Sequence, residues 1–506
     1  MSVRNQQPAD TVQATAPGMK AQVMSALRWS ALAKLAGQIV NWGITLFVIR
    51  LLTPADYGLV AMLTLVMTFV AMIGDMGFGS SIVQASTLEK EDIRRTFGAA
   101  LILNALVCGL MLIAAPAIAA FYGETRLVDM TRVSAIGFLG SGIASIYSGL
   151  LQREMRFRTS ARIDILTGIA GNVGTLGLAL CGFGPWALVL GSLIGVPVRV
   201  GLLLSSATRI YSPSFRLGET RKLWGFGGNL LITRIVWYWS SQADLLIAGK
   251  YLGKDLLGFY SVAVHLASLP MQRAAGIING VAFAAFAKIQ HDSRAVAANT
   301  RLGVRLMAFA TFPILWGIGA VAPELVRVAI GPAWQESILP LTLIALTIPF
   351  RMIGSIISTT IMSMGRVDIA MITNVIGFFL LVPLFYVGAR YGIVGLSVAW
   401  LVVTPLMFML NMFRALPTLG LSMPGVISEI WRPLLSAAVM FVAVEGARRL
   451  LDGIGDVPRF AALVAFGAAI YCICAWLVNR AATIEALVLI FPSRFAHLRA
   501  ASYTAS

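Results

Sequence analysis

The sequence predicts an all-α polytopic membrane protein with about 14 transmembrane helices, in two parallel six-helix lobes around a central cavity plus two extra C-terminal helices. Three observations predict it: apolar stretches of bilayer length fill the chain, cations gather in alternate loops, and one segment recurs 200 residues later. Hydrophobic residues make up 58% of the chain and charged residues 12%. A bilayer core requires roughly 20 apolar residues per helical span, so nearly all of the ordered mass is expected within the membrane.

The apolar stretches are separated by loops too short to fold alone. The predicted spans cover 25–51, 57–80, 97–121, 128–151, 163–182, 185–206, 225–249, 256–286, 303–323, 337–362, 368–388, 393–414, 429–450 and 458–479. They divide the chain into a disordered cytoplasmic N-terminus at 1–24, an N-lobe at 25–206, a cytoplasmic linker at 207–224, a C-lobe at 225–414, two extra helices at 415–480 and a cytoplasmic tail at 481–506.

The positions of lysine and arginine predict the orientation. The second, fourth, sixth and eighth loops are basic, whereas the odd loops carry few cations. By the positive-inside rule, this alternation places both termini in the cytoplasm of a bacterial inner membrane. The net charge of +17 is therefore topological and does not indicate nucleic acid. The outward pair Arg448-Arg449 is an exception and leaves the orientation of the last two spans open.

Two internal echoes predict that the halves are repeats. The run Arg50–Gly58 lies 200 residues before Lys250–Gly258. In each run an apolar helix is predicted to end at a cation, and the next helix is predicted to begin near the glycine. A second echo pairs Arg162–Asp164 with Arg366–Asp368, each expected to open the fifth span of its half. Six spans per half is an even number, so the halves share one orientation. Transporters that work by alternating access often have this design.

Ionisable residues deep in the spans are candidate functional residues, because such positions are costly in a membrane. Lys34 lies about 13 Å into the first span, and Arg234 is its repeat equivalent. Asp75 and Arg273 lie late in the second and eighth spans, which run inward. These residues predict a basic, inward-facing cavity for an anionic headgroup, with Asp75 as charge partner of Lys34 or as ion carrier. The alternative is that Lys34 snorkels to the interface and Asp75 is solvated at a helix end.

Four further residues are weaker candidates for the same cavity. Arg351 lies midway along the tenth span and would add a cation, and Asp244 in the seventh span would carry a coupling ion. Trp237 and Trp239 would stack on sugar rings, with ordinary packing or an aromatic belt as the alternative. The sequence contains no phosphate-binding loop and no metal motif, so no cofactor is expected. The driving force would come from an ion gradient or from substrate consumption on the far side.

Several stretches resemble the bacterial polysaccharide transporter family, the Wzx-type flippases of the multidrug/oligosaccharidyl-lipid/polysaccharide exporter superfamily. The stretches are Arg50–Ala61, Gly74–Gln84, Asp244–Gly253, Leu257–Ala263 and Leu269–Arg273, and Ile277–Gln290 resembles the branch that exports colanic-acid or xanthan repeat units. The resemblance implies a V-shaped cavity lined by helices one, two, seven and eight. It also implies an undecaprenyl-pyrophosphate-linked oligosaccharide substrate. The second helix offers Asp75 and no deep cation, so the headgroup site cannot be copied from the related lipid II flippases.

The leading interpretation is a flippase that moves lipid-linked exopolysaccharide units to the periplasmic leaflet by alternating access, and is not an enzyme. A cation-coupled drug or metabolite antiporter of the same superfamily is the nearest alternative, although its cavity should favour acidic groups. A membrane polymerase or glycosyltransferase is a third, although it should carry catalytic groups in a sizeable outward loop. The expected partners are the lipid-linked oligosaccharide, membrane lipids and a polysaccharide polymerase or co-polymerase, with no nucleic acid.

Overall fold

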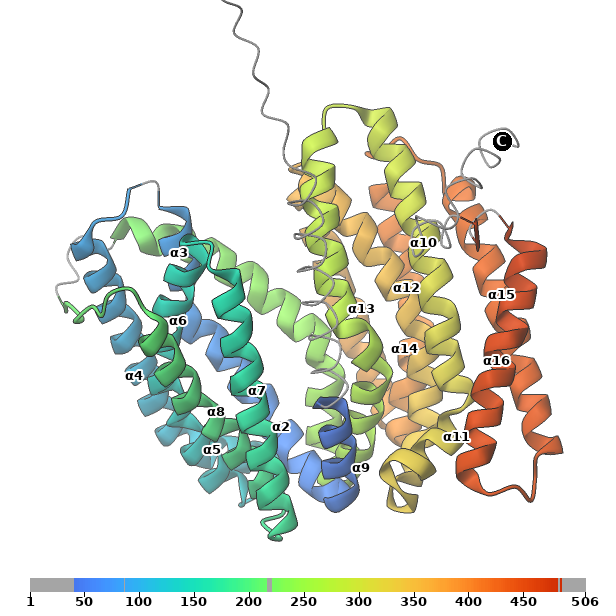
Figure 1. The fold of residues 1–506 in the computed structure, drawn as a ribbon, viewed down its shortest axis with the longest axis horizontal. Coiled ribbons are helices and arrows are strands. Elements are labelled where there is room, and N and C mark those ends of the chain that lie inside the picture. The colour runs from blue at the N-terminus through green and yellow to red at the C-terminus, as the bar shows by residue number, and fades with distance from the viewer. Residues whose placement is uncertain (1–40, 86, 216–220, 481–482, 485–506) are drawn as a thin grey trace, which may run out of the picture.

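The computed structural model describes residues 41–85, 87–215, 221–480 and 483–484, and for the helical residues 221–234, 236, 237 and 271–284 it describes the backbone alone. Every regular element in these residues is a helix (Figure 1). A helix over Asn41–Leu51 precedes the labelled elements. The others are α2 (Pro54–Asp75), α3 (Phe78–Gln84), α4 (Lys90–Tyr122), α5 (Leu127–Ala135), α6 (Gly137–Arg153), α7 (Phe157–Leu180), α8 (Pro185–Ser206), α9 (Arg221–Ile289), α10 (Ser293–Ala320), α11 (Ala322–Leu325), η1 (Val326–Ile330), η2 (Pro332–Ser337), α12 (Ile338–Ser363), α13 (Val367–Ala389), α14 (Gly392–Ala415), α15 (Met423–Leu450) and α16 (Asp456–Val478).

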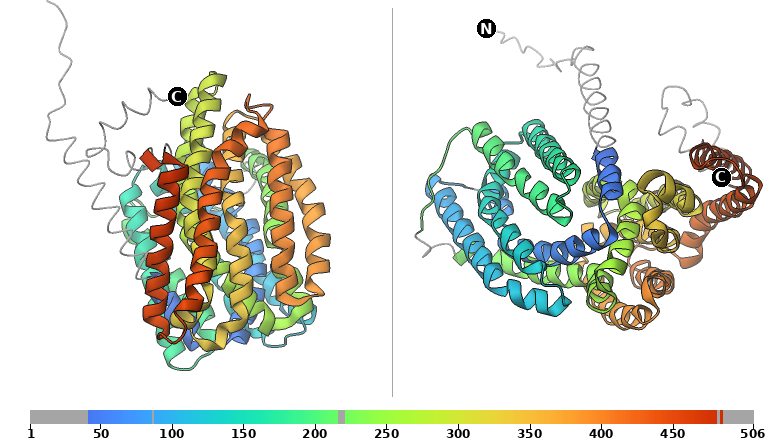
Figure 2. Two further views of the ribbon diagram at one scale, coloured as in Figure 1. Left: turned by 90° about the vertical axis from the view of Figure 1, so that its right-hand side faces the viewer. Right: turned by 90° about the horizontal axis from the view of Figure 1, so that it is seen from below.

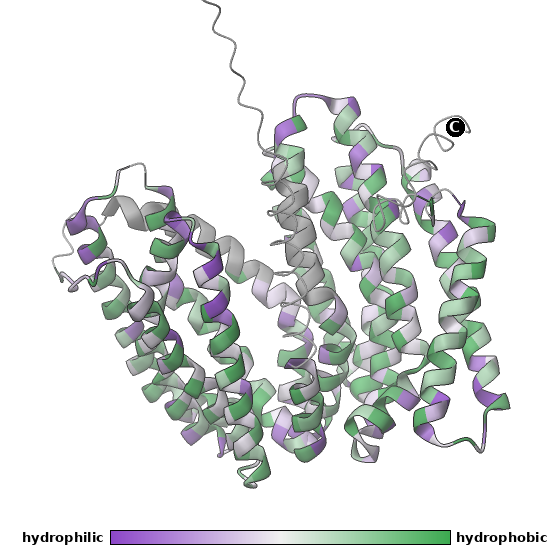
Figure 3. Cartoon of the chain, viewed as in Figure 1, coloured by the Kyte–Doolittle hydropathy of each residue, from purple (hydrophilic) through white to green (hydrophobic). Residues whose placement is uncertain are grey.

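Eleven helices among the described residues are long and apolar enough to cross a membrane. Three of them join two elements, since α2 continues into α3, α5 into α6 and η2 into α12. Hydrophobic residues make up most of the middle of the helices, and hydrophilic ones are more frequent near their ends (Figure 3). The predicted polytopic, all-helical class is therefore confirmed, while the total of 14 spans stays a prediction.

The helices form two groups that lie side by side (Figure 1). We call Asn41–Leu51 with α2–α8 the N-lobe and α9–α14 the C-lobe. The last two helices, α15 and α16, lie at the edge of the C-lobe that is farthest from the N-lobe (Figure 2). They pack on α10, where the Tyr471 hydroxyl donates a hydrogen bond to the Phe309 carbonyl at 3.0 Å.

Helix α9 contains both the seventh and the eighth predicted spans. Its 69 residues are interrupted at Gly253, whose φ of 77° lies in the left-handed region that favours glycine. The backbone bends there without an intervening loop, and the two arms rise from the bend (Figure 1). Glycine at this position thus lets one continuous element serve as two spans.

The start of α2 is specified locally. Thr53 accepts a hydrogen bond from the Asp56 backbone N–H at 3.3 Å, and the Asp56 carboxylate accepts one from the Thr53 backbone N–H at 3.0 Å. This reciprocal capping box, with Pro54 as the first helical residue, is a strong helix-start signal. It places the chain reversal between the first and second spans at this point.

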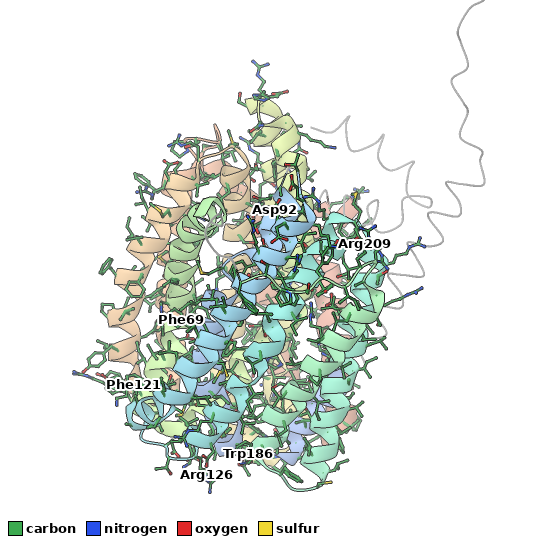
Figure 4. All side chains as sticks on the ribbon, turned by 90° about the vertical axis from the view of Figure 1, so that its left-hand side faces the viewer. Phe69, Asp92, Phe121, Arg126, Trp186 and Arg209 are labelled. Atoms are coloured by element: carbon green, nitrogen blue, oxygen red, sulfur yellow. The ribbon has the colours of Figure 1, made fainter. Side chains whose placement is uncertain are left out.

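The two ends of the molecule differ in charge. The end that carries the connections α3–α4, α6–α7, α8–α9 and α9–α10 holds the basic loops recognised in the sequence, and we call it the basic end. In the N-lobe, Asp92 and Arg209 lie toward this end, whereas Phe121, Arg126 and Trp186 lie toward the other (Figure 4). The lobes diverge toward the basic end and converge at the opposite one (Figure 1).

The second internal echo was wrong in register. Helix α7 begins at Phe157, so Arg162 lies inside it and does not open it. The structural match is Arg156 with Arg366, since these residues precede α7 and α13 with nearly the same backbone angles, φ −83° and ψ 52° against φ −88° and ψ 59°. Each follows a residue with positive φ, Met155 and Gly365. The turn conformation, and not the residue types, is what repeats.

Arg448, one of the two adjacent arginines at the predicted outward end, belongs to an ion-pair cluster. Glu324 is fully buried, and its carboxylate lies 2.9 Å from Arg448 Nε and 3.4 Å from Arg459 Nε. Arg448 also pairs with Glu445. Acidic partners thus neutralise cations at the end where the positive-inside rule expects few.

Glu324→Ala is expected to lower the free energy of unfolding by about 3–5 kcal/mol, because it would leave two guanidinium groups without their buried partner. The free energy of unfolding would be measured by equilibrium denaturation of the purified protein in detergent. Glu336→Ala is the matched control, since Glu336 is exposed on the neighbouring η2. Equal stabilities for the two variants would contradict a structural role for the cluster.

Candidate functional site

At the end opposite the basic end, two glycines bring the backbones of α2 and α9 into close contact. A Cβ atom built on Gly58 would lie 1.8 Å from the carbonyl oxygen of Lys254, and one built on Gly258 would lie 1.8 Å from that of Pro54. Pro54 and Gly58 correspond to Lys254 and Gly258 at the spacing of 200 residues. In a contact between two-fold-related surfaces, residue i touches j and j touches i. The contact between α2 and α9 therefore has the symmetry expected of a parallel internal repeat.

Polar and aromatic contacts reinforce this junction. Lys254 Nζ lies 2.7 Å from Glu124 Oε1, which joins α9 to the connection after α4. Trp334 of η2 is fully buried and donates a hydrogen bond from Nε1 to the Ile49 carbonyl at 3.1 Å. Its ring meets that of Tyr57 edge-on, with centroids 5.5 Å apart. We call the end defined by Gly58, Gly258 and these contacts the closed end.

A buried polar cluster lies in the C-lobe. Asp244 on the first arm of α9 is 3% exposed, and its Oδ2 accepts hydrogen bonds from Tyr260 Oη at 2.7 Å and from Trp400 Nε1 at 2.9 Å. Its other carboxylate oxygen, Oδ1, is buried and has no hydrogen-bond partner among the described atoms. An unsatisfied, buried carboxylate oxygen is costly. The cluster can therefore accept a proton or a small cation at Oδ1.

Arg351 lies on the other side of the same tryptophan. Its guanidinium stands over the Trp400 ring, 4.5 Å from the centroid, in a cation–π contact. Trp400 thus lies between a cation on its face and the Asp244 carboxylate at its N–H. The structure brings together two residues, Arg351 and Asp244, that the sequence had singled out separately.

The other predicted site residues do not form one described cluster. Lys34 lies outside the described residues, and Arg234, Arg273 and Trp237 lie on α9 where the backbone alone is described. Trp239 packs against Phe69 of α2, with ring centroids 5.0 Å apart, which is a packing contact between α9 and the N-lobe.

Asp75 is exposed at the break between α2 and α3. Ser145 of α6 donates a hydrogen bond to its Oδ1 at 3.2 Å. The described neighbours of Asp75 therefore belong to the N-lobe, apart from the Asp244 cluster in the C-lobe.

Sequence reasoning missed Tyr260 and Trp400, the two donors to Asp244, because each is an ordinary aromatic residue in an apolar helix. It also missed the ion pair between Glu124 and Lys254, because charged residues in predicted loops are expected to face solvent and not each other. The available signal for Lys254 was its position inside the repeated segment, four residues before Gly258. Tyr260 lies in the stretch Leu257–Ala263 that carries the family resemblance, whereas for Trp400 the sequence carried no such signal.

The fold and these contacts define a polytopic membrane protein of two repeated helical lobes, which are joined along α2 and the first arm of α9, while their other helices diverge toward the basic end. Residues 47–339 match the model of the family described as "Polysaccharide biosynthesis protein". The chain belongs to this family. The resemblance found in the sequence is thereby confirmed.

Curated relatives span most of the chain. The teichuronic acid biosynthesis protein TuaB of Bacillus subtilis is 24% identical over 442 residues, which cover 85% of this chain and 90% of the relative. The lipopolysaccharide biosynthesis protein WzxC of Escherichia coli is 25% identical over 423 residues, which cover 82% and 85%. The succinoglycan biosynthesis transport protein ExoT of Rhizobium meliloti is 30% identical over 329 residues, which cover 63% and 65%.

Solved structures share the fold. The lipid II flippase MurJ in an inward closed conformation matches with a TM-score of 0.73 at 15% identity, covering 89% of this chain and 98% of that structure. An inward-facing multidrug transporter of the MATE family matches with a TM-score of 0.58 at 16% identity, covering 76% and 95%. Both neighbours are membrane transporters.

Proposed function

We propose that this protein is a flippase that moves an undecaprenyl-pyrophosphate-linked oligosaccharide repeat unit of an exopolysaccharide from the cytoplasmic to the periplasmic leaflet. The observation that carries the proposal is the arrangement of the lobes, which are joined by the glycine contacts at the closed end and diverge toward the basic end (Figure 1). If the basic end faces the cytoplasm of the inner membrane, as the positive-inside rule favours, the space between the lobes is accessible to a substrate made there.

The relatives support the substrate class. WzxC and ExoT are named for lipopolysaccharide and succinoglycan biosynthesis, and MurJ is named a lipid II flippase. All three names point to glycans, and the fold neighbour adds a lipid carrier. We therefore propose an anionic lipid headgroup as the ligand between the lobes, held by Arg273, Arg234, Lys34 and Arg351, with Trp237 against the sugars.

The proposed driving force is an ion gradient coupled through Asp244. The uncompensated Oδ1 of this carboxylate is the supporting observation, since binding of a proton or a sodium ion there would satisfy it. The same observation favours a cation-coupled antiporter as the second candidate.

We do not propose an enzymatic activity, because ExoT is named a transport protein and MurJ a flippase. A polymerase or co-polymerase is the proposed partner on the periplasmic side.

The direct test is the sidedness of the lipid-linked repeat unit in cells depleted of this protein. We expect complete repeat units to accumulate on the cytoplasmic leaflet, because synthesis continues while translocation stops. Sidedness would be measured by the accessibility of the glycan to a membrane-impermeant enzyme in intact cells and in inverted vesicles. Truncated units, or complete units already on the periplasmic leaflet, would discard the flippase proposal.

A further inference from the structure

A polar cavity of about 370 Å³ lies inside the N-lobe, between the end of α2, one face of α6 and Arg199 of α8. Cavities of about 300–1,000 Å³ are typical of small-molecule sites. Asp75, Ser141 and Gln152 line it and are exposed although they lie on membrane-spanning helices. Polar groups at such positions face a water-filled space or a ligand and not lipid.

One face of α6 supplies the hydrogen-bonding groups. Ser141, Ser145, Ser148 and Gln152 follow each other at intervals of four, three and four residues, which places them on a single helical face. Phe138, three residues before Ser141, continues this face and lines the cavity, although it is only 7% exposed. The cavity therefore offers a ladder of hydroxyl and amide groups that ends on an aromatic ring.

The opposite wall is a break in the second span. Met76 and Gly77 both have positive φ, 34° and 75°, and Met76 is a non-glycine residue in this region. Asn104 of α4 is buried and holds the break, since its Nδ2 donates hydrogen bonds to the Gly74 carbonyl at 3.0 Å and to the Ala100 carbonyl at 2.9 Å. Discontinuous helices in transporters mark binding sites, and backbone strain concentrates at such sites. The break turns Asp75 toward Ser145.

The described lining residues carry no surplus of positive charge. Asp75 supplies one carboxylate and Arg199 one guanidinium. Arg199 is also paired with Asp164 at 2.9 Å, so its charge is already compensated. Among the described lining residues a pyrophosphate would meet no surplus of positive charge, whereas a sugar hydroxyl can both donate to a carboxylate and accept from an arginine or an amide. The volume exceeds by about tenfold the roughly 30 Å³ share of one water, so the cavity is too large for a bare ion.

We propose that this cavity binds a sugar ring of the glycan, separately from the headgroup site between the lobes. The inference rests on the proposed flippase function and adds the N-lobe as the place where the glycan is recognised. Asp75, Ser145 and Gln152 bind ring hydroxyls, and Phe138 packs against the apolar face of the ring. Asp75 is accordingly a glycan-binding residue and not an ion carrier.

The test compares two lipids bound by the purified full-length protein in nanodiscs: the lipid-linked repeat unit isolated from the producing cells, and undecaprenyl pyrophosphate without sugar. Ser141→Leu places a bulky side chain in the cavity, and the double variant Ser148→Ala/Gln152→Ala removes hydrogen-bonding groups without adding volume. Ser192→Leu is the matched control, because Ser192 is exposed on α8 outside the cavity. Thermal unfolding midpoints would confirm that each variant is folded.

We expect the cavity variants to raise the dissociation constant for the glycan-bearing lipid at least about tenfold, the equivalent of one or two lost hydrogen bonds, and to leave binding of the sugarless lipid unchanged. Equal losses for both lipids, or no loss for either, would overturn the glycan site. If the unaltered protein binds neither lipid, the proposed function itself fails. The two failures are thus distinguishable.

Discussion

Gly58→Ala and Gly258→Ala should each open the closed end and strongly reduce transport. An alanine Cβ at either position would lie 1.8 Å from a backbone carbonyl oxygen of the other lobe, far inside van der Waals contact. Backbone cannot move aside as a side chain can, so α2 and α9 must separate. We expect the transport rate to fall at least about tenfold, which corresponds to a destabilisation of the closed state by roughly 1.4 kcal/mol.

The separation can be measured directly with cysteines. Glu124→Cys and Lys254→Cys replace the ion pair whose charged atoms lie 2.7 Å apart, in a background where the exposed Cys181 and Cys472 are serine. A short bifunctional reagent should cross-link the two new cysteines in the otherwise unaltered protein. We expect the yield to fall several-fold when Gly58 becomes alanine.

Gly109→Ala is the matched control, because a Cβ on this α4 glycine meets nothing within 4 Å. It should change neither cross-linking nor transport. If Gly58→Ala retained both, the close approach of the lobes would not be a required state of the transport cycle.

The two glycine variants should also have similar effects. Gly58 and Gly258 are equivalent positions of the repeat. Gly58 meets the carbonyl of Lys254 and Gly258 meets that of Pro54, and these two partners are also equivalent positions. An alternating-access transporter must break this junction once per cycle, so the junction has to be strong enough to close and weak enough to open. Reciprocal glycines achieve a close backbone approach without a large interlocking side chain that would resist opening.

Much of the fold follows from hydropathy and charge. The span predicted at 185–206 coincides with α8, because Gly184-Pro185 starts the helix sharply. The first repeat was recognisable because a close backbone contact requires glycine at both Gly58 and Gly258. Met155 and Gly365 occupy equivalent turns and both have positive φ, although only one of them is glycine. At this position the backbone conformation repeats and the residue type does not.

The candidate site was less predictable, since it depends on contacts between distant helices. Asp244 and Trp400 are 156 residues apart and meet in the C-lobe interior. Nothing local marks a tryptophan that donates to a buried carboxylate. The sequence could indicate that Asp244 is costly in a membrane, but not that one of its oxygens is paired and the other is not.

Asp244→Asn is the second variant with a large expected effect. The amide keeps the size of the side chain and leaves one oxygen to accept from Tyr260 and Trp400, but it cannot take up a proton or bind a cation through a negative charge. If Asp244 carries the coupling ion, transport should fall at least about tenfold and lose its dependence on the proton or sodium gradient. Uptake of the lipid-linked unit into proteoliposomes with an imposed gradient of either ion would measure both effects.

Thermal stability separates this loss of coupling from unfolding. A buried charge is costly, so a neutral amide at position 244 should leave the unfolding midpoint unchanged or raise it. Asp255→Asn is the control, because Asp255 is exposed on the same helix beyond the Gly253 bend. A variant at Asp244 that kept full gradient dependence would assign the carboxylate to packing alone, and coupling would then require another group. A variant that lost stability and transport together would mean that Tyr260 and Trp400 need the charge to fold, and the ion-coupling role would be withdrawn.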